Sequence, residues 1–211
     1  MRLTCAKIAR TTIVTFGISC CSIGLSAMPD YQESINAHQS QFEKVALDLW
    51  NFAELGYQET QSSTLLQAEL KEEGFTVTSG IADIPTAFKA EYGTGGPVIC
   101  ILGEVDALPG IAQSISPFKE TIDNATGASQ ACGHHLFGTG SAWAAVAIKE
   151  WLEETKTPGR VVFYGTPAEE GGSGKVYMAR SGAFDNVDIM LHWHPGSSND
   201  ASPRSTNSNK S

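Results

Sequence analysis

The sequence has few positively charged residues. Its 211 residues include 14 lysines and arginines against 23 aspartates and glutamates, which gives a formal net charge of −9 at pH 7. Binding of nucleic acid requires a basic face for the phosphates, and no basic cluster is visible. The composition therefore argues against a nucleic-acid partner and favours small molecules or proteins. The hydrophobic fraction of 41% is sufficient for a packed core.

The sequence also lacks a long apolar run. The uncharged stretch 11–26 (TTIVTFGISCCSIGLS) is rich in serine and threonine, and it is short for a membrane span. It follows the cationic segment MRLTCAKIAR and ends near the small residue Ala27. This pattern predicts a cleaved secretory signal over residues 1–27, so that the mature chain is exported, periplasmic or secreted, without a stable membrane span. A retained anchor or a lipid-modified cysteine is the alternative.

Cysteine is scarce outside that segment. Three of the five cysteines precede Ala27, which leaves Cys100 and Cys132 in the mature chain. Cys100 stands in the apolar run PVICIL, which is typical of a buried core thiol. Cys132 stands beside two histidines. A disulfide between them is compatible with export, but the two contexts differ.

Apolar periodicity predicts an alternation of helices and strands. The helices are expected over 31–55, 60–73, 138–154 and 174–181, and the strands over 75–78, 86–92, 98–102, 160–165 and 187–191. A loop over 109–130 separates the two halves. This order predicts an α/β fold in three layers, α/β/α, with a largely parallel central sheet.

The C-terminal residues are polar and nothing after the last expected strand closes the fold. Residues 197–211 read SSNDASPRSTNSNKS. We therefore expect residues 28–196 to be the N-terminal part of a domain that is incomplete at its C-terminus. Residues 197–211 are then a polar linker into further, absent sequence, with a natively disordered tail as the alternative.

Four polar clusters follow expected strands or precede the long helix. They are Glu104-Val-Asp106, Cys132-Gly-His134-His135, Glu169-Glu170 and His192-Trp-His194. Because ligands bind at the carboxyl ends of the strands in open α/β sheets, these clusters are expected to meet. Thiolate, imidazole and carboxylate groups are ligands of Zn²⁺ and similar ions. Any one cluster alone could instead be a helix cap or a solvated turn.

The motifs around these clusters carry a family resemblance. EVDALPG (104–110), ACGHHLFG (131–138), GTPAEEGG (165–172) and WHPG (193–196) occur in this order. Together they resemble the M20 family of metallopeptidases and amidohydrolases, in particular the branch of the aminobenzoyl-glutamate hydrolases. The resemblance implies a catalytic α/β domain with two divalent ions, Zn or Mn. It also implies that residues 28–196 are the N-terminal part of this catalytic domain. Residues 197–211 then lead toward an absent, smaller inserted lid domain, through which the full-length form is a homodimer.

The resemblance also implies a role for each motif residue. The metal ligands are expected to be Cys132, His134, Glu170 and His194. Asp106 is expected to orient the metal ligands, and Glu169 to act as general base. This division is chemically reasonable, because one carboxylate binds a cation while its neighbour stays free to move a proton. The implied reaction is hydrolysis of the amide bond of an N-acyl or aminobenzoyl amino acid, or of a small peptide.

Several alternatives stay open. His135 and His192 are possible additional groups near the ions. Relatives supply a last histidine ligand from a C-terminal segment, so that one metal position in this chain is expected to lack a ligand. The chain is then either a truncated hydrolase or a non-catalytic metal-binding or interaction fragment. A third hypothesis is a thiol hydrolase with Cys132 as nucleophile.

Overall fold

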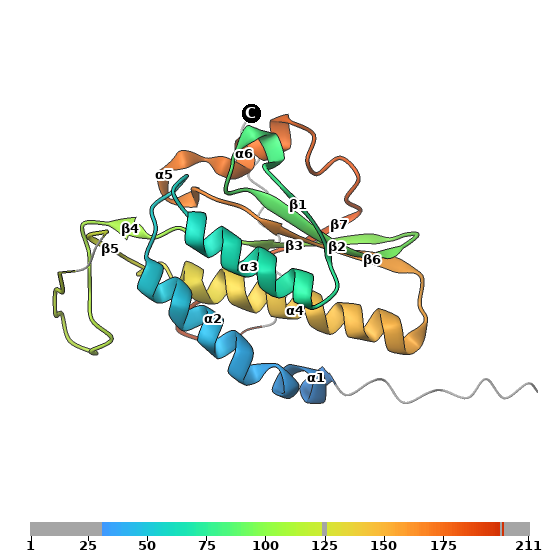
Figure 1. The fold of residues 1–211 in the computed structure, drawn as a ribbon, viewed down its shortest axis with the longest axis horizontal. Helices are drawn as coiled ribbons and strands as arrows, with labels where there is room; N and C mark the ends of the chain where they lie inside the picture. Colours follow the sequence, from blue (N-terminus) through green and yellow to red (C-terminus); the bar gives the residue numbers. More distant parts are fainter. Residues whose placement is uncertain (1–30, 124–125, 199, 201–211) are drawn as a thin grey trace, which may run out of the picture.

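The computed structural model describes residues 31–123, 126–198 and 200 (Figure 1). The expected signal over 1–27 and most of the expected linker lie outside these residues. Among the described residues, no helix is long and apolar enough to cross a membrane.

A five-stranded sheet forms the centre of the fold, in the order β1-β2-β6-β3-β7. Its strands are β1 (Thr76–Ser79), β2 (Phe88–Thr94), β3 (Val98–Gly103), β6 (Gly159–Gly165) and β7 (Ile189–Leu191). β3 pairs in parallel with both β6 and β7, whereas β2 pairs antiparallel with β1 and β6. Four strands therefore run in one direction and β2 runs against them. The expected α/β class is confirmed, with a mixed sheet.

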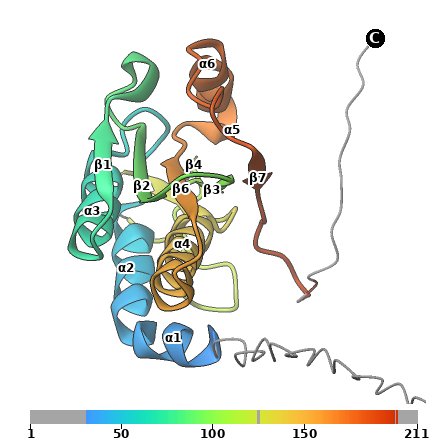
Figure 2. The same cartoon turned by 90° about the vertical axis from the view of Figure 1, so that its right-hand side faces the viewer.

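Helices cover both faces of this sheet, as Figure 2 shows. On one side lie α1 (Tyr31–Ala37), α2 (Gln39–Phe52), α3 (Thr60–Glu72) and α4 (His134–Thr155); on the other lie α5 (Glu169–Gly172) and α6 (Gly174–Arg180). Each interface has its own apolar cluster. Phe42, Leu66 and Phe163 belong to the first, and Cys100 and Met178 belong to the second. Cys100 is fully buried, in agreement with its apolar sequence context.

Several expected element boundaries were wrong, by two or more residues at the strands expected over 86–92 and 187–191, and three differences change the description of the fold. The helix expected over 31–55 is interrupted at His38, whose ψ of 0° lies outside the helical range, although the apolar period continues across it. The helix expected from 138 begins at His134, directly after Gly133 with a φ of 81°. The segment expected to be a loop over 109–130 is not wholly irregular, because its two ends form the short paired strands β4 (Leu108–Pro109) and β5 (Ala128–Ser129).

α4 approaches the end of β3 closely at Gly138. A Cβ atom at Gly138 would lie 2.6 Å from Val105 Cγ1 and 2.7 Å from the carbonyl oxygen of Glu104. The carbonyl oxygen is part of the backbone, so it cannot move aside as a flexible side chain could. The glycine therefore lets the first turns of α4, which carry His134, lie against the segment that carries Glu104 and Asp106.

We predict that Gly138→Ala destabilises the protein. Alanine is favoured over glycine inside a helix by about 1 kcal/mol. Overpacking of a tight contact costs about 1–3 kcal/mol. Because the added methyl group would meet the backbone, we expect this cost to exceed the gain in helix propensity. Urea unfolding should show a net loss in the free energy of unfolding of up to about 2 kcal/mol. Ala144→Ser, on the exposed side of α4, is the control and should change it by less than about 0.5 kcal/mol. A Gly138→Ala protein as stable as the wild type would contradict the prediction.

Candidate metal centre

The four polar clusters meet at the carboxyl ends of β3, β6 and β7. Glu104 and Asp106 follow β3, and His134 begins α4. Glu169 and Glu170 form the short α5 after β6, and the histidines at 192 and 194 follow β7. The segments converge because three parallel strands deliver their following residues to the same edge of the sheet.

His134 lies at the centre of this group and is fully buried. Its Nδ1 atom lies 3.0 Å from both the Oδ1 atom and the carbonyl oxygen of Asp106, so Nδ1–H is the donor there. The Nε2 atom faces three further carboxylates. It lies 3.0 Å from Glu104 Oε2, 3.8 Å from Glu170 Oε1 and 3.9 Å from Glu169 Oε2.

Two buried atoms that face each other have no hydrogen-bond partner, His134 Nε2 and Glu170 Oε1; Nδ1 of the neighbouring His135 is a third such atom in the clusters. The contact of Nε2 with Glu104 is short, but it does not have the direction of a hydrogen bond. Buried polar atoms without partners are costly and rare. A divalent cation would satisfy both atoms. A histidine whose Nδ1 donates to a carboxylate while Nε2 stays free is also the usual arrangement of a metal ligand. The residues present therefore fit a metal ion.

Asp106 connects two of the expected ligands. Its Oδ1 atom accepts from His134, and its Oδ2 atom accepts from the backbone amide of Glu170 at 2.9 Å. The carboxylate is almost completely buried. Asp106 thus connects α4 and α5, which is compatible with the orienting role that the family resemblance implies for it.

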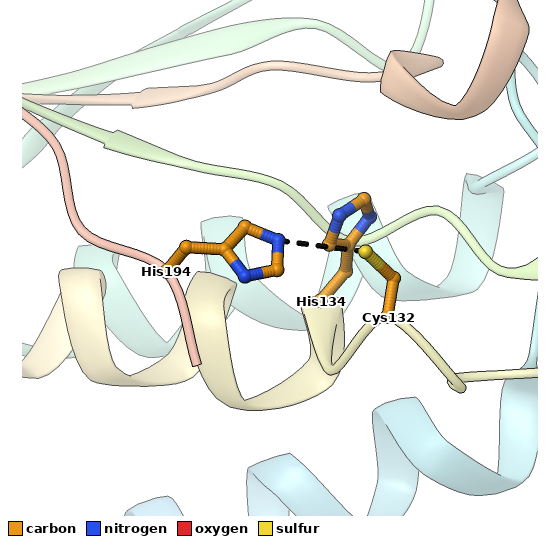
Figure 3. Close-up of side chains that lie close together, drawn as sticks. All are labelled: Cys132, His134 and His194. Carbon is orange, nitrogen blue, oxygen red and sulfur yellow. Dashed lines mark hydrogen bonds between the residues drawn. The ribbon is translucent and has the colours of Figure 1, made fainter. Parts of the chain in front are cut away.

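Cys132 and His194 form a second contact at the same edge (Figure 3). The Sγ atom of Cys132 lies 3.5 Å from Nε2 of His194, and Nδ1 of His194 is 3.0 Å from the carbonyl oxygen of Pro195. In each of two groups, the candidate ligand atoms all lie within 4.8 Å of one another. Cys132, His134 and His194 form the first group, and Glu104, His134 and Glu169 form the second; the expected ligand Glu170 belongs to neither. His134 belongs to both groups.

The charges in this cluster shift three pKa values. Burial alone lowers the pKa of His134, but the hydrogen bond to Asp106 and the negative charges of Asp106 and Glu104 outweigh it and raise the pKa to about 10. Burial raises the pKa of Glu104, but His134 and Lys175 lower it to about 2. Burial and the nearby Glu170 raise the pKa of the Cys132 thiol to about 12. Without a cation, a Cys132 thiolate is therefore disfavoured, which argues against Cys132 as a nucleophile.

Two residues at the site have no role in the sequence-based prediction. Glu104 belongs to one of the clusters, but only Asp106 of that cluster was assigned a role. Lys175, on α6, contacts Glu104 Oε1 through its Nζ atom. Its position after Gly-Ser-Gly carries no sequence signal for such a contact.

His135 and His192 lie outside both groups of candidate ligand atoms. The His135 ring packs edge-on against Trp50 at 5.1 Å, and burial lowers its pKa to about 4. The His192 ring packs against Phe137 at 5.0 Å. Both histidines therefore contact the aromatic surroundings of the site.

A cavity of about 180 Å³ adjoins the carboxylates. Asp106 and Glu170 line it together with Leu55, Tyr57 and Pro109, among others. A larger, open depression of about 770 Å³ lies at the opposite end of β3 and β6, and none of the expected site residues lines it. The smaller cavity is the one next to the chemically reactive groups.

The fold and the cluster together define an α/β domain with a candidate site for divalent ions. Residues 100–205 match peptidase family M20/M25/M40. The chain therefore belongs to this family, which confirms the resemblance of its motifs.

The relatives are longer than this chain. It is 43% identical over 163 residues to a p-aminobenzoyl-glutamate hydrolase subunit of Escherichia coli, which covers 77% of the chain and 34% of that protein. It is 30% identical over 185 residues to human Xaa-Arg dipeptidase, covering 80% of the chain and 38% of the relative. A dinuclear metal-binding M20 peptidase of Bacillus subtilis superposes with a TM-score of 0.65 at 26% identity, covering 76% of this chain and 44% of the other. The chain thus spans little more than a third of the length of these two curated relatives.

We predict that Zn²⁺ protects Cys132 from iodoacetamide, because a metal ligand is not free to react. Labelling of the Cys132 peptide, followed by mass spectrometry, should be slow at neutral pH in chelator and slower still with Zn²⁺. Cys100 is fully buried and should stay unlabelled in both cases, which makes it the internal control. Rapid labelling that Zn²⁺ leaves unchanged would favour the nucleophile hypothesis.

We also predict that His134 is doubly protonated at pH 8 in metal-free protein. Because the pKa of His134 is raised, protonation of the ring contributes fully to the stability of the fold below pH 6.5, the ordinary pKa of histidine. This contribution is lost as the pH rises through about 10. ¹H–¹⁵N NMR of the ring nitrogens in the presence of a chelator measures the transition. A midpoint near 6.5 or lower would contradict the proposed contacts with Asp106 and Glu104.

Proposed function

We propose that the chain is the N-terminal catalytic part of an exported, metal-dependent amidohydrolase. The observation that carries this proposal is the pair of buried atoms without hydrogen bonds, His134 Nε2 and Glu170 Oε1, which face each other at 3.8 Å. The proximity of Cys132 and His194 supports it. Family membership gives independent support for hydrolysis.

The proposed ligands are Cys132, His134, Glu170 and His194. The dinuclear Bacillus subtilis relative supports two divalent ions. The two candidate ligand groups share His134, whose Nε2 atom can bind only one ion, so the groups themselves account for one of the two. The thiolate favours Zn²⁺, whereas imidazole and carboxylate suit both Zn²⁺ and Mn²⁺. When bound, such ions polarise an amide carbonyl and lower the pKa of a water molecule.

Glu169 is proposed to move the proton. Its carboxylate lies 3.9 Å from His134 Nε2, at the border of the cluster, and 44% of its side chain is exposed. It can therefore reach both the site and solvent. In the proposed mechanism Glu169 takes a proton from the attacking water and gives it to the leaving amine as the amide bond breaks. Asp106 keeps His134 and Glu170 in place during this exchange.

The proposed substrates are N-acyl or aminobenzoyl amino acids and small peptides. The names of the two relatives, an aminobenzoyl-glutamate hydrolase subunit and a dipeptidase, support an amide bond next to an amino acid. The cavity of about 180 Å³ beside Asp106 and Glu170 is proposed to hold one of the two groups that flank the amide bond of the substrate. We further propose that the full-length form is a homodimer.

A non-catalytic metal-binding fragment is the second candidate function. It is favoured by one observation, namely that the chain spans 34% and 38% of the two curated relatives. It predicts ion binding without turnover.

The test is amine release from a panel of N-acyl and aminobenzoyl amino acids by protein loaded with Zn²⁺ or Mn²⁺. We expect Glu169→Gln to reduce kcat by about 10²–10⁴-fold, because a positioned general base contributes about that much. The variant should still bind the ion. Turnover that survives Glu169→Gln would contradict the proposed base, and ion binding with no turnover by the wild type would favour the second function.

A further inference from the structure

Lys175 is the cation that pairs with the carboxylates of the candidate metal centre. Among the described residues, it is the only lysine or arginine that forms an ion pair with Glu104, Asp106, Glu169 or Glu170. The lysine projects from α6, and 27% of its side chain is exposed. Its charge therefore reaches the site from the solvent side.

The partner, Glu104, is buried and uses its two oxygens differently. Its residue exposure is 3%, so its charge requires a partner. Oε1 contacts Lys175, while Oε2 lies 3.0 Å from His134 Nε2. His192 Nε2 lies 3.9 Å from Oε1, but 49% of the His192 side chain is exposed. Lys175 therefore occupies one oxygen and leaves Glu104 a single oxygen for the metal centre.

This arrangement has two consequences for a bound cation. A positive charge beside the site reduces the attraction that the surrounding carboxylates exert on a divalent ion. A carboxylate held at one oxygen also cannot turn to bind the ion with both. Both effects lower the affinity for the ion.

We propose that Lys175 is a positioning residue that limits the metal affinity of the site by holding Glu104. This inference rests on the proposed function, because it requires that an ion binds near His134. Removal of Lys175 should free the buried carboxylate to interact with the ion, and binding should then become tighter. Loss of structure cannot explain such a gain.

The experiment measures the affinity of the full chain for Zn²⁺ in competition with a chromophoric chelator. We expect Lys175→Met to bind Zn²⁺ about tenfold more tightly than the wild type, since one nearby positive charge is removed at a partly screened position. Lys175→Arg keeps the charge and the contact, and it should stay within about threefold of the wild type. Arg180→Met is the matched control, because it removes one charge from the exposed end of the same helix. It should leave the affinity unchanged.

A double variant tests whether Lys175 acts through Glu104. In a Glu104→Gln background, the further change Lys175→Met should produce a smaller gain than in the wild type. An undiminished gain would mean that Lys175 acts without Glu104, contrary to the proposal. Far-ultraviolet circular dichroism verifies that each variant is folded.

The two proposals fail in different ways. A wild-type protein that does not compete with the chelator for Zn²⁺ would contradict the proposed function itself. A wild-type protein that binds Zn²⁺ while Lys175→Met binds with equal or lower affinity would overturn only the role of Lys175.

Discussion

The hydrogen bond from His134 Nδ1 to Asp106 is the interaction on which the candidate site depends. It fixes the orientation of a buried imidazole and leaves Nε2 free to face Glu104 and Glu170. The same aspartate accepts the backbone amide of Glu170, so one carboxylate positions groups from two different helices. Close packing at Gly138 brings the first turns of α4 near enough for this contact.

The negative charges around His134 explain why the site suits a cation. Four carboxylates converge on one buried ring, and their repulsion is unfavourable unless positive charge lies among them. In the metal-free protein that charge comes from the protonated imidazole and from Lys175. A divalent ion can take the place of the imidazole proton, because its ligand atom is the same Nε2. The charge balance and the set of ligand atoms therefore both favour binding of a divalent cation.

Much of the fold could be predicted from sequence because its elements have strong local patterns. The apolar run of β3 and the helical period of α3 each identify one element. Because polar clusters follow parallel strands, their convergence was also predictable, although the assigned catalytic and ligand roles stay predictions. The start of α4 at His134 was missed because its first turn is made of functional residues. Lys175 was missed because its contact with Glu104 spans 71 positions and is set only by the placement of α6.

The direction of β2 shows a further limit of sequence patterns. Alternation of apolar residues identifies a strand but not the neighbour with which it pairs. The short connection 80–87 between β1 and β2 permits the antiparallel pairing, whereas the parallel strands are joined by helices. The antiparallel pairs lie at the β1–β2 side of the sheet. The site residues follow the three parallel strands β6, β3 and β7 on the other side.

The most direct test of the central claim is anomalous X-ray diffraction at the zinc edge from crystals grown with Zn²⁺. We predict a peak at about 2.0–2.1 Å from His134 Nε2, as expected of a Zn–N bond, with Nδ1 still bonded to Asp106. Cys132 or Glu170 should complete the contacts of that ion. Ordered crystals in which zinc binds elsewhere and His134 Nε2 has no metal neighbour would contradict the claim.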